Sequence, residues 1–329
     1  MTYKVSVAPM MDCTDRHDRY FLRLMSKNVM LYTEMIATKS ALHGDRKKVL
    51  SYSPEEKPLA LQVGGSDKKE LSEVAKIAEE MGYDEININL GCPSKKVQKN
   101  KFGACLMKEP DLVSECINEM VNSCKIPVTA KTRIGFDDVE DFNYLNKFIL
   151  KMNEAGCKAF IIHARKAMLK GLSPKQNLNI PKLNYEMVYK IKKENPDLKI
   201  TINGGISTTD EVKKHLKSCD GVMIGRAIYQ NPYFLVDLEK EIFEVQNHPS
   251  REDVAEQLLN YLEKEVKLGT KVNHIMRHTV GLYHGQVGSK KWKRYLSDNM
   301  MARNSDFQKA KHIMTIVQNN EKANQNIYD

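Results

Sequence analysis

The sequence has 329 residues, with 51 Lys and Arg against 42 Asp and Glu, and a net charge of +9. This length can bury a sizeable core, either in one large barrel with a small appended domain or in two ordinary domains, so a small disulfide-stapled scaffold is excluded. The N-terminal stretch lacks the apolar core of a signal peptide, and no apolar run reaches the roughly 18 residues of a membrane span. We therefore expect a cytoplasmic protein.

The seven cysteines form neither a disulfide framework nor a metal-ligand pattern. They are odd in number and scattered, and cytoplasmic thiols stay reduced. A structural zinc site usually contains a Cys-x-x-Cys pair, which this sequence lacks, so we expect no metal. Cys92 and Cys105 lie close together in one small, basic and apolar segment, which raises the question of which one is chemically active.

Eight short β-rich runs follow one another along the chain, each ending in a turn former. They begin at Val5, Met30, Leu59, Glu85, Pro127, Ala159, Lys199 and Gly221. Helical periodicity fills intervening segments such as 68–82, 111–124 and 139–156. The alternation predicts a parallel sheet covered on both faces, and eight units predict a closed (β/α)8 barrel. An open doubly wound sheet is disfavoured because no Gly-x-Gly-x-x-Gly turn follows the first strand.

After Tyr229 the strand pattern stops and helical patterns take over, notably at 251–269 and 306–320. Within the polar segment 244–253, Pro249 separates two helical stretches and Ser250 is placed to cap the second. We therefore expect a barrel of residues 1–243 followed by a smaller all-helical domain of residues 244–329.

The excess positive charge is concentrated in one segment. Residues 271–294 hold six Lys or Arg and three His without an acidic residue, and Tyr283 and Trp292 lie among them. Composition alone is equally compatible with a solvated surface. Basic side chains interleaved with aromatic rings also suit a phosphate backbone and exposed bases.

Polar residues end nearly every predicted strand, at the edge where a (β/α)8 barrel carries its active site. A loop can satisfy any one of them. Together, however, a Lys, a His and the Arg residues at one mouth require an anionic or hydrogen-bonding ligand. The residues at these strand ends are Pro9, Met10, Glu34, Gln62, Asn87, Asn89, Lys131, Arg133, His163, Arg165, Asn203 and Arg226.

Glycine-bearing turns follow the last two predicted strands, where barrels build a phosphate site. Gly204 and Gly205 follow Asn203, and Gly225 precedes Arg226. Glycine lets backbone N–H groups approach phosphate oxygens closely, and Arg226 adds charge.

Three further strand-end residues, Gln62, Lys131 and His163, are placed to face a planar ring rich in N–H and C=O groups. Lys131 is suited to stabilise the negative charge on a reduced flavin.

Successive motifs of the chain resemble those of the tRNA-dihydrouridine synthases, most of all the bacterial A subfamily. The resemblance runs in order from about Val5 to Pro232 and resumes through GSKKWKRYLS. Its motifs are VAPMMDCTDRHDRYFLRLMS, LYTEMI, ALQVGGSD, GYDEININLGCPSKKVQKNKFGACLM, VTAKTRIGFDD, FIIHARKAMLKGLSPKQN, INGGI and GVMIGRAIYQNP.

The resemblance implies a barrel that depends on flavin mononucleotide (FMN) and a C-terminal helical domain that grips the tRNA elbow. The implied activity is reduction of D-loop uridine, at positions 20 and 20a, to 5,6-dihydrouridine with electrons from NADPH. We expect a monomer without a membrane or protein partner.

By this resemblance Cys92, in GCPS, is the general acid that protonates C5 of the uracil as flavin N5 delivers hydride to C6. A thiol with a pKa of about 8.5 is mostly protonated at neutral pH, which agrees with this role. We interpret Cys105 and the remaining cysteines as small core residues.

The resemblance also implies contacts for other residues. Those to the flavin ring come from Pro9, Met10, Met11, Gln62, Lys131 and His163. Those to its phosphate come from Asn203, Gly204, Gly205, Gly225 and Arg226. Asn89 and Arg165 are expected to touch the uracil, and the tRNA backbone is expected to meet Lys290, Lys291, Lys293 and Arg294.

One position departs from the family pattern. After SPKQN the family usually shows an Arg, and this chain has Leu178. The RNA contact is therefore either lost or taken over by Lys175 or Lys182, which leaves open which D-loop uridines are modified.

Two alternatives stay open from the sequence. A flavin-dependent reductase of a free pyrimidine, similar to dihydroorotate dehydrogenases, would also use a flavin-bearing barrel, although a free metabolite needs no large basic surface. A non-catalytic tRNA-binding protein could keep the same scaffold, against which the intact Cys92, Lys131 and His163 count.

Overall fold

The computed structural model describes residues 3–300 and residue 308. The chain divides into two compact units, the first formed by the residues up to Asp12 and 29–225, and the second by residues 13–28 and the chain from Arg226 onward. The predicted boundary at 243/244 rests on the polar segment that separates two helical stretches, and it stays a prediction. Apart from residue 308, the predicted helix at 306–320 lies outside the described residues.

The first unit is the predicted (β/α)8 barrel. Its parallel strands pair in the order β1-β9-β8-β7-β6-β5-β4-β2, and β3 also pairs with β4. A parallel bridge between Ser6 and Met30, where Val7 N donates to Met30 O at 2.9 Å, joins the two ends and nearly closes the barrel. The strands are β1 Val5–Val7, β2 Leu31–Tyr32, β3 Ile36–Ala37, β4 Leu59–Gly64, β5 Glu85–Asn89, β6 Val128–Arg133, β7 Ala159–His163, β8 Lys199–Asn203 and β9 Gly221–Ile224.

The predicted second strand is interrupted, which the sequence did not indicate. Between β2 and β3 the side chain of Thr33 takes part in the pairing, because its Oγ1 accepts a hydrogen bond of 3.0 Å from Gln62 N. Because a side-chain oxygen here replaces a backbone carbonyl as the acceptor, the backbone pairing with β4 stops after β2 and resumes at Ile36.

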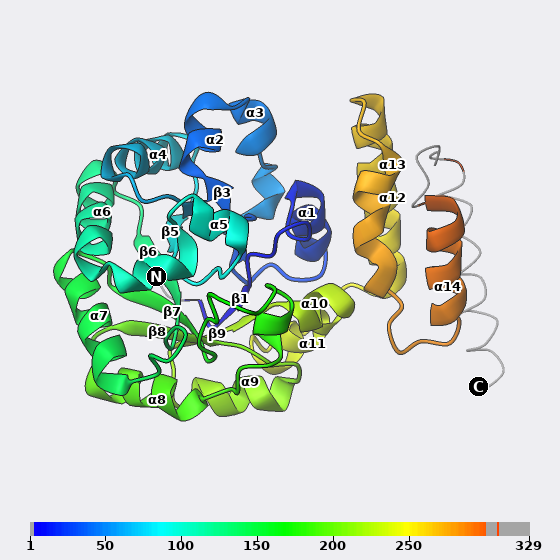
Figure 1. Cartoon of the computed structure of the whole chain (residues 1–329). Helices are drawn as coiled ribbons and strands as arrows, with labels where there is room; N and C mark the ends of the chain where they lie inside the picture. Colours follow the sequence, from blue (N-terminus) through cyan, green and yellow to red (C-terminus); the bar gives the residue numbers. More distant parts are fainter. Residues whose placement is uncertain (1–2, 301–307, 309–329) are drawn as a thin grey trace. The chain divides into compact units, whose positions relative to one another are not determined.

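Amphipathic helices surround the strands of the first unit (Figure 1). In α4 the buried residues Leu71, Val74, Ala75 and Ala78 recur at helical spacing, and Asp67 caps the first turn. The predicted helices at 68–82, 111–124 and 139–156 are confirmed as α4, α6 and α7. The helices of this unit are α2 Thr38–His43, α3 Arg46–Val49, η1 Pro54–Glu56, α4 Lys68–Glu80, α5 Lys95–Lys99, η2 Gly103–Lys108, α6 Pro110–Ser123, α7 Phe142–Glu154, η3 Gln176–Leu178, α8 Tyr185–Glu194 and α9 Thr209–Leu216.

The described part of the second unit consists of helices joined by turns and loops, without a strand. The rings of Tyr20 and Tyr261 stack at 3.8 Å, and Arg277 pairs with Asp15 at 2.5 Å, so residues 13–28 are fastened to the C-terminal helices. Ser250 caps its helix in a capping box with Asp253, as predicted. Its helices are α1 Arg16–Arg23, α10 Arg226–Gln230, α11 Phe234–Glu241, α12 Arg251–Lys267, α13 Val272–Met276, η4 Arg277–Gly281, α14 Ser289–Tyr295 and η5 Leu296–Met300. In the described part of both units, no helix has the length and apolarity needed to cross a membrane.

Candidate active site

Cys92 lies in the turn that follows β5, and the side chain of Asn89 holds that turn. Asn89 Oδ1 accepts hydrogen bonds from Gly91 N at 3.1 Å and Cys92 N at 2.9 Å. The thiol is half-buried, and burial raises its pKa against the opposing charges of Arg133 and Lys131. Cys92 therefore stays protonated at neutral pH and can give a proton to a bound substrate.

Cys105 is also half-buried, so its interpretation as a core residue is wrong. Its thiol donates to Phe102 O at 3.1 Å, and the buried side chains of Phe102 and Leu106 fill the core beside it. Burial also raises the pKa of Cys105. Cys116, Cys157 and Cys219 are buried as expected, whereas Cys13 and Cys124 are half-buried, and all seven cysteines are free thiols.

Lys131 projects from β6, and its ammonium donates to Asn203 Oδ1 at 3.1 Å. The strand register places Asn89 beside Lys131 and His163 beside Asn203, so polar side chains from four strands meet at one end of the barrel. The pKa of Lys131 is lowered to about 7, mainly by burial and also by the nearby charge of Arg133, while Cys92 opposes the shift. Because an anionic ligand would favour the charged form, this site is suited to bind one.

The glycine turns leave no room for a side chain. Gly204 has a φ of +121° and Gly205 a φ of +75°, and a Cβ on Gly204 would lie 3.3 Å from Cε1 of His163. A Cβ on Gly225 would lie 3.3 Å from Cβ of Ala8. Gly204 and Gly205 therefore suit glycine through their backbone conformation and the close approach of neighbouring side chains, whereas at Gly225 only the close approach favours it.

Gln62 is buried on β4 between two asparagines of β5. Its Nε2 donates to Asn87 Oδ1 and its Oε1 accepts from Asn89 Nδ2, both at 2.8 Å. A carboxamide has two N–H groups and two acceptor lone pairs, so one of each remains for a ligand.

The segment after β1 carries the three remaining predicted ring contacts. Pro9 and Met10 are half-buried, and Met10 packs against an apolar cluster that includes Ala8, Ile161 and Met223. Met11 is 54% exposed. Pro9 and Met10 therefore join the apolar lining of the first unit, whereas Met11 faces solvent.

The sequence places Arg133 at a strand end without indicating its role. Its guanidinium is buried and donates to the backbone carbonyls of Gly91 at 2.9 Å, Lys166 at 3.1 Å and Asn177 at 3.2 Å. Burial lowers its pKa to about 10. Arg133 thus fastens the Cys92 turn to the loop that follows β7. The signal was the two-residue spacing of Thr129, Lys131 and Arg133, which places all three on one face of β6.

The loop that follows β7 carries the predicted substrate contacts. Arg165 Nη1 donates to the backbone carbonyls of Asn179 and Pro181, so part of its guanidinium is committed to the loop. Leu178 is half-buried in η3, whereas Lys175 and Lys182 are exposed. The position where the family pattern is broken therefore holds an apolar side chain, with the exposed Lys175 before it and the exposed Lys182 after it in the loop.

The predicted tRNA cations Lys290, Lys291, Lys293 and Arg294 are all exposed on α14. The aromatic residues among them are buried. Tyr283 and Trp292 are 0% exposed, and Trp292 Nε1 donates to Thr279 O at 2.8 Å. Their interpretation as partners for exposed bases is wrong, because they form the core of the second unit.

Arg226, a predicted phosphate contact, is exposed and begins α10 in the second unit.

Among the described residues, no group of three or more His, Cys, Asp or Glu could hold a metal ion.

The fold and these residues define a class of protein, a barrel enzyme whose polar groups gather at the C-terminal ends of its strands. The sequence model of dihydrouridine synthase (Dus) matches residues 6–320, and the chain belongs to this family.

Several curated relatives share about half of their residues with this chain. One from Synechocystis sp. is 50% identical over 298 residues, covering 90% of this chain and 89% of its own. One from Shewanella oneidensis is 52% identical over 295 residues, covering 89% of this chain and 88% of its own. One from Escherichia coli K12 is 48% identical over 316 residues, covering 95% of this chain and 91% of its own. Each is named tRNA-dihydrouridine(20/20a) synthase.

Proposed function

We propose that the protein reduces uridines 20 and 20a in the D loop of tRNA to 5,6-dihydrouridine. Membership of the dihydrouridine synthase family and the shared name of its relatives support this reaction. The observation that carries it is geometric: Asn89, whose side chain holds the Cys92 turn, pairs with Lys131 across strands β5 and β6 at the mouth of the first unit.

The residues at the mouth fit FMN. Gly204, Gly205 and Gly225 form turns that a Cβ would fill, which supports close approach of backbone groups to a phosphate. Lys131 suits the negative charge that a flavin ring takes up on reduction, and Gln62 retains one N–H and one lone pair for the ring. His163 lies next to Gly204.

FMN, when bound, supplies the hydride that reaches C6 of the uracil, with NADPH as the electron source. Cys92 holds the proton at Sγ that C5 of the uracil receives. Asn89 and Arg165 orient the uracil, and Arg133 holds the turn that carries Cys92. Because burial keeps the thiol protonated, Cys92 enters the reaction as an acid rather than a thiolate.

The exposed cations of α14 support binding of a polyanion such as tRNA. We assign this contact to the predicted helical domain of residues 244–329. Extrusion of a base from folded RNA costs a few kcal/mol, which binding elsewhere on the tRNA must supply. The proposal includes a cytoplasmic monomer, because nothing in the reaction requires a membrane or a second protein.

Mass mapping of tRNA from cells that lack this protein tests the proposal. We expect dihydrouridine to disappear at positions 20 and 20a and to return when purified protein, FMN and NADPH are added to that tRNA. Free uridine serves as the competing substrate. Reduction of free uridine at a rate similar to that of tRNA, or an unchanged dihydrouridine map, would contradict the proposal.

A further inference from the structure

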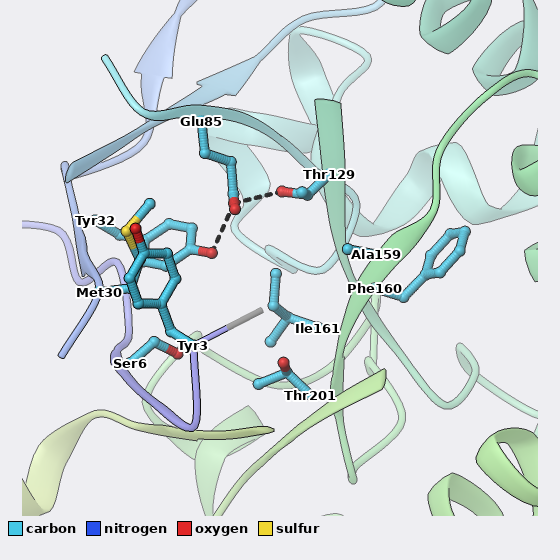
Figure 2. Close-up of a pocket in the computed structure, with 10 residues that line it drawn as sticks. All are labelled: Tyr3, Ser6, Met30, Tyr32, Glu85, Thr129, Ala159, Phe160, Ile161 and Thr201. Atoms are coloured by element: carbon cyan, nitrogen blue, oxygen red, sulfur yellow. Dashed lines mark hydrogen bonds between the residues drawn. The ribbon is translucent and has the colours of Figure 1, made fainter. Parts of the chain in front are cut away.

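Glu85 is a buried carboxyl group at the opposite end of β5 from the Cys92 turn. Glu85, Asn87 and Asn89 are spaced two apart on this strand, so they share one face, and four residues separate the ends by about 13 Å. Glu85 is 7% exposed and lines a cavity of about 20 Å³ with Tyr32 and Thr129, among other residues (Figure 2). None of the reaction steps proposed above uses this group.

Hydrogen bonds connect the Cys92 turn to Glu85 through four side chains, Asn89, Gln62, Asn87 and Thr129, which we call the polar ladder. In its upper half, Cys92 N donates to Asn89 Oδ1 at 2.9 Å, and Asn89 Nδ2 donates to Gln62 Oε1 at 2.8 Å. Gln62 Nε2 then donates to Asn87 Oδ1 at 2.8 Å. The strand register places Gln62 directly opposite Asn87.

In its lower half, Asn87 Nδ2 donates to Thr129 Oγ1 at 2.8 Å, and Thr129 Oγ1 donates to Glu85 Oε1 at 2.6 Å. Tyr32 OH donates to the same oxygen of Glu85 at 2.7 Å. Figure 2 shows the hydroxyl groups of Tyr32 and Thr129 converging on the Glu85 carboxyl group. The ladder therefore ends on an acceptor.

Every donor in the polar ladder points the same way, from the Cys92 turn toward Glu85. The upper end is fixed because two backbone N–H groups, of Gly91 and Cys92, require the oxygen of Asn89. The lower end is fixed because Glu85 offers its oxygen to two hydroxyl groups. Hydrogen bonds aligned in this way strengthen one another, so the orientation of each amide depends on both ends.

We propose that Glu85 is a positioning residue that fixes, through the polar ladder, the orientation of the Gln62 amide and the place of the Cys92 turn. The proposal rests on the proposed function only for the roles of Gln62 and Cys92 in the reaction. Thr129 is the residue that connects Glu85 to the amides. Removal of its hydroxyl leaves Asn87 Nδ2 without its acceptor, and Asn87 and Gln62 can then reorient.

Hydrogen exchange at the Cys92 backbone amide tests the proposal directly, because this N–H is the first donor of the ladder. The test variant is Thr129→Val, which keeps the side-chain shape. The matched control is Thr201→Val, the same change in the same cavity but outside the ladder. We expect Thr129→Val to speed exchange at Cys92 about tenfold and Thr201→Val to leave it within twofold of the wild type.

Variants of Glu85 itself show whether its side chain acts as a hydrogen-bond acceptor or only fills space. Glu85→Gln keeps an oxygen for both hydroxyls and should retain wild-type exchange at Cys92, whereas Glu85→Met should behave like Thr129→Val. If Glu85→Met does not fold, the two threonine variants still decide the question. In the FMN-loaded enzyme we expect Thr129→Val to lower kcat about tenfold with KM for tRNA within twofold.

Equal exchange at Cys92 in Thr129→Val and Thr201→Val would overturn the proposal. Faster exchange with unchanged kcat would overturn the positioning role. A wild-type protein that makes no dihydrouridine would contradict the proposed function instead, while the exchange rates would still report on the ladder.

Discussion

The ammonium of Lys131 on β6 donates a 3.1 Å hydrogen bond to Oδ1 of Asn203 on β8. These strands are not neighbours, because β7 lies between them in the sheet. Asn203 Nδ2 donates to Met223 O at 2.8 Å, which fixes the amide with its oxygen toward Lys131. The pair therefore places the Lys131 amino group at the barrel mouth, where an anionic ligand would favour its charged form.

Replacement of Lys131 by Met should weaken FMN binding about ten- to a hundredfold, since a hydrogen bond to a charged group contributes roughly 1.5–3 kcal/mol. Fluorescence titration of the FMN-free protein measures this affinity. Lys158→Met is the control, because Lys158 is exposed and precedes β7 at its other end. Equal affinities of the two variants for FMN would contradict the assignment of Lys131.

The stability of the FMN-free protein should depend on pH through Lys131. Its pKa is about 7 in the folded state, below its ordinary value of 10.5, so between these values the unfolded chain holds a proton that the folded chain lacks. Stability therefore rises with pH across this window, by at most about 1.4 kcal/mol per pH unit.

Urea unfolding at pH 7, 8 and 9 measures the effect. Lys131→Met should lack this contribution, so the free energy of unfolding of the wild type should rise relative to that of the variant as the pH increases. A constant difference across the three pH values would show that Lys131 keeps its ordinary pKa.

Gly204→Ala should reduce FMN affinity beyond its effect on stability. The added Cβ would lie 3.3 Å from His163, at a φ of +121° that disfavours alanine. Gly269→Ala is the matched control, because Gly269 has a φ of +92° but open space around it. Both variants should lower the Tm, whereas only Gly204→Ala should weaken FMN binding at least tenfold. Equal FMN affinities would exclude a cofactor contact at this turn.

Replacement of Lys290, Lys291, Lys293 and Arg294 by Ala should weaken tRNA binding and flatten its salt dependence. Each lost phosphate contact lowers the slope of log K against log salt by roughly one. The control removes four exposed lysines on outer helices, Lys76, Lys147, Lys193 and Lys214. FMN binding should be unchanged in both variants. If the two variants lose the same affinity, the effect is one of net charge, and α14 is not the tRNA contact.

Much of the first unit could be predicted because short stretches of its sequence carry the patterns of individual strands and helices. β-rich runs such as 59–64 and 85–89 are strands in the structure, and their alternation with helices predicted the barrel. The grouping of residues 13–28 with the C-terminal helices was missed, because the stacking of Tyr20 on Tyr261 joins positions far apart in sequence.

In the second unit, residue type alone gave a wrong prediction for the burial of two aromatic side chains. The charged neighbours of Trp292 suggest an exposed aromatic ring, but Trp292 and Leu296 are both buried and lie four residues apart, the spacing of one helical face. Tyr283 packs edge to face on Trp292 at 5.1 Å. The roles of Glu85 and Arg133 depend on side-chain contacts across strands and loops, which periodicity does not report.

Formation of dihydrouridine by the Cys92→Ala variant tests the central claim most directly. Unmodified tRNA, FMN and NADPH would be supplied to the wild type, Cys92→Ala and Cys105→Ala, and dihydrouridine would be counted by mass spectrometry. Loss of the general acid should slow the reaction about 10²- to 10⁴-fold in Cys92→Ala, while FMN binding and flavin reduction by NADPH stay at wild-type levels. Cys105→Ala should remain within twofold of the wild type. Wild-type rates in Cys92→Ala, or an equal loss in both variants, would contradict the assignment of Cys92 as the proton donor.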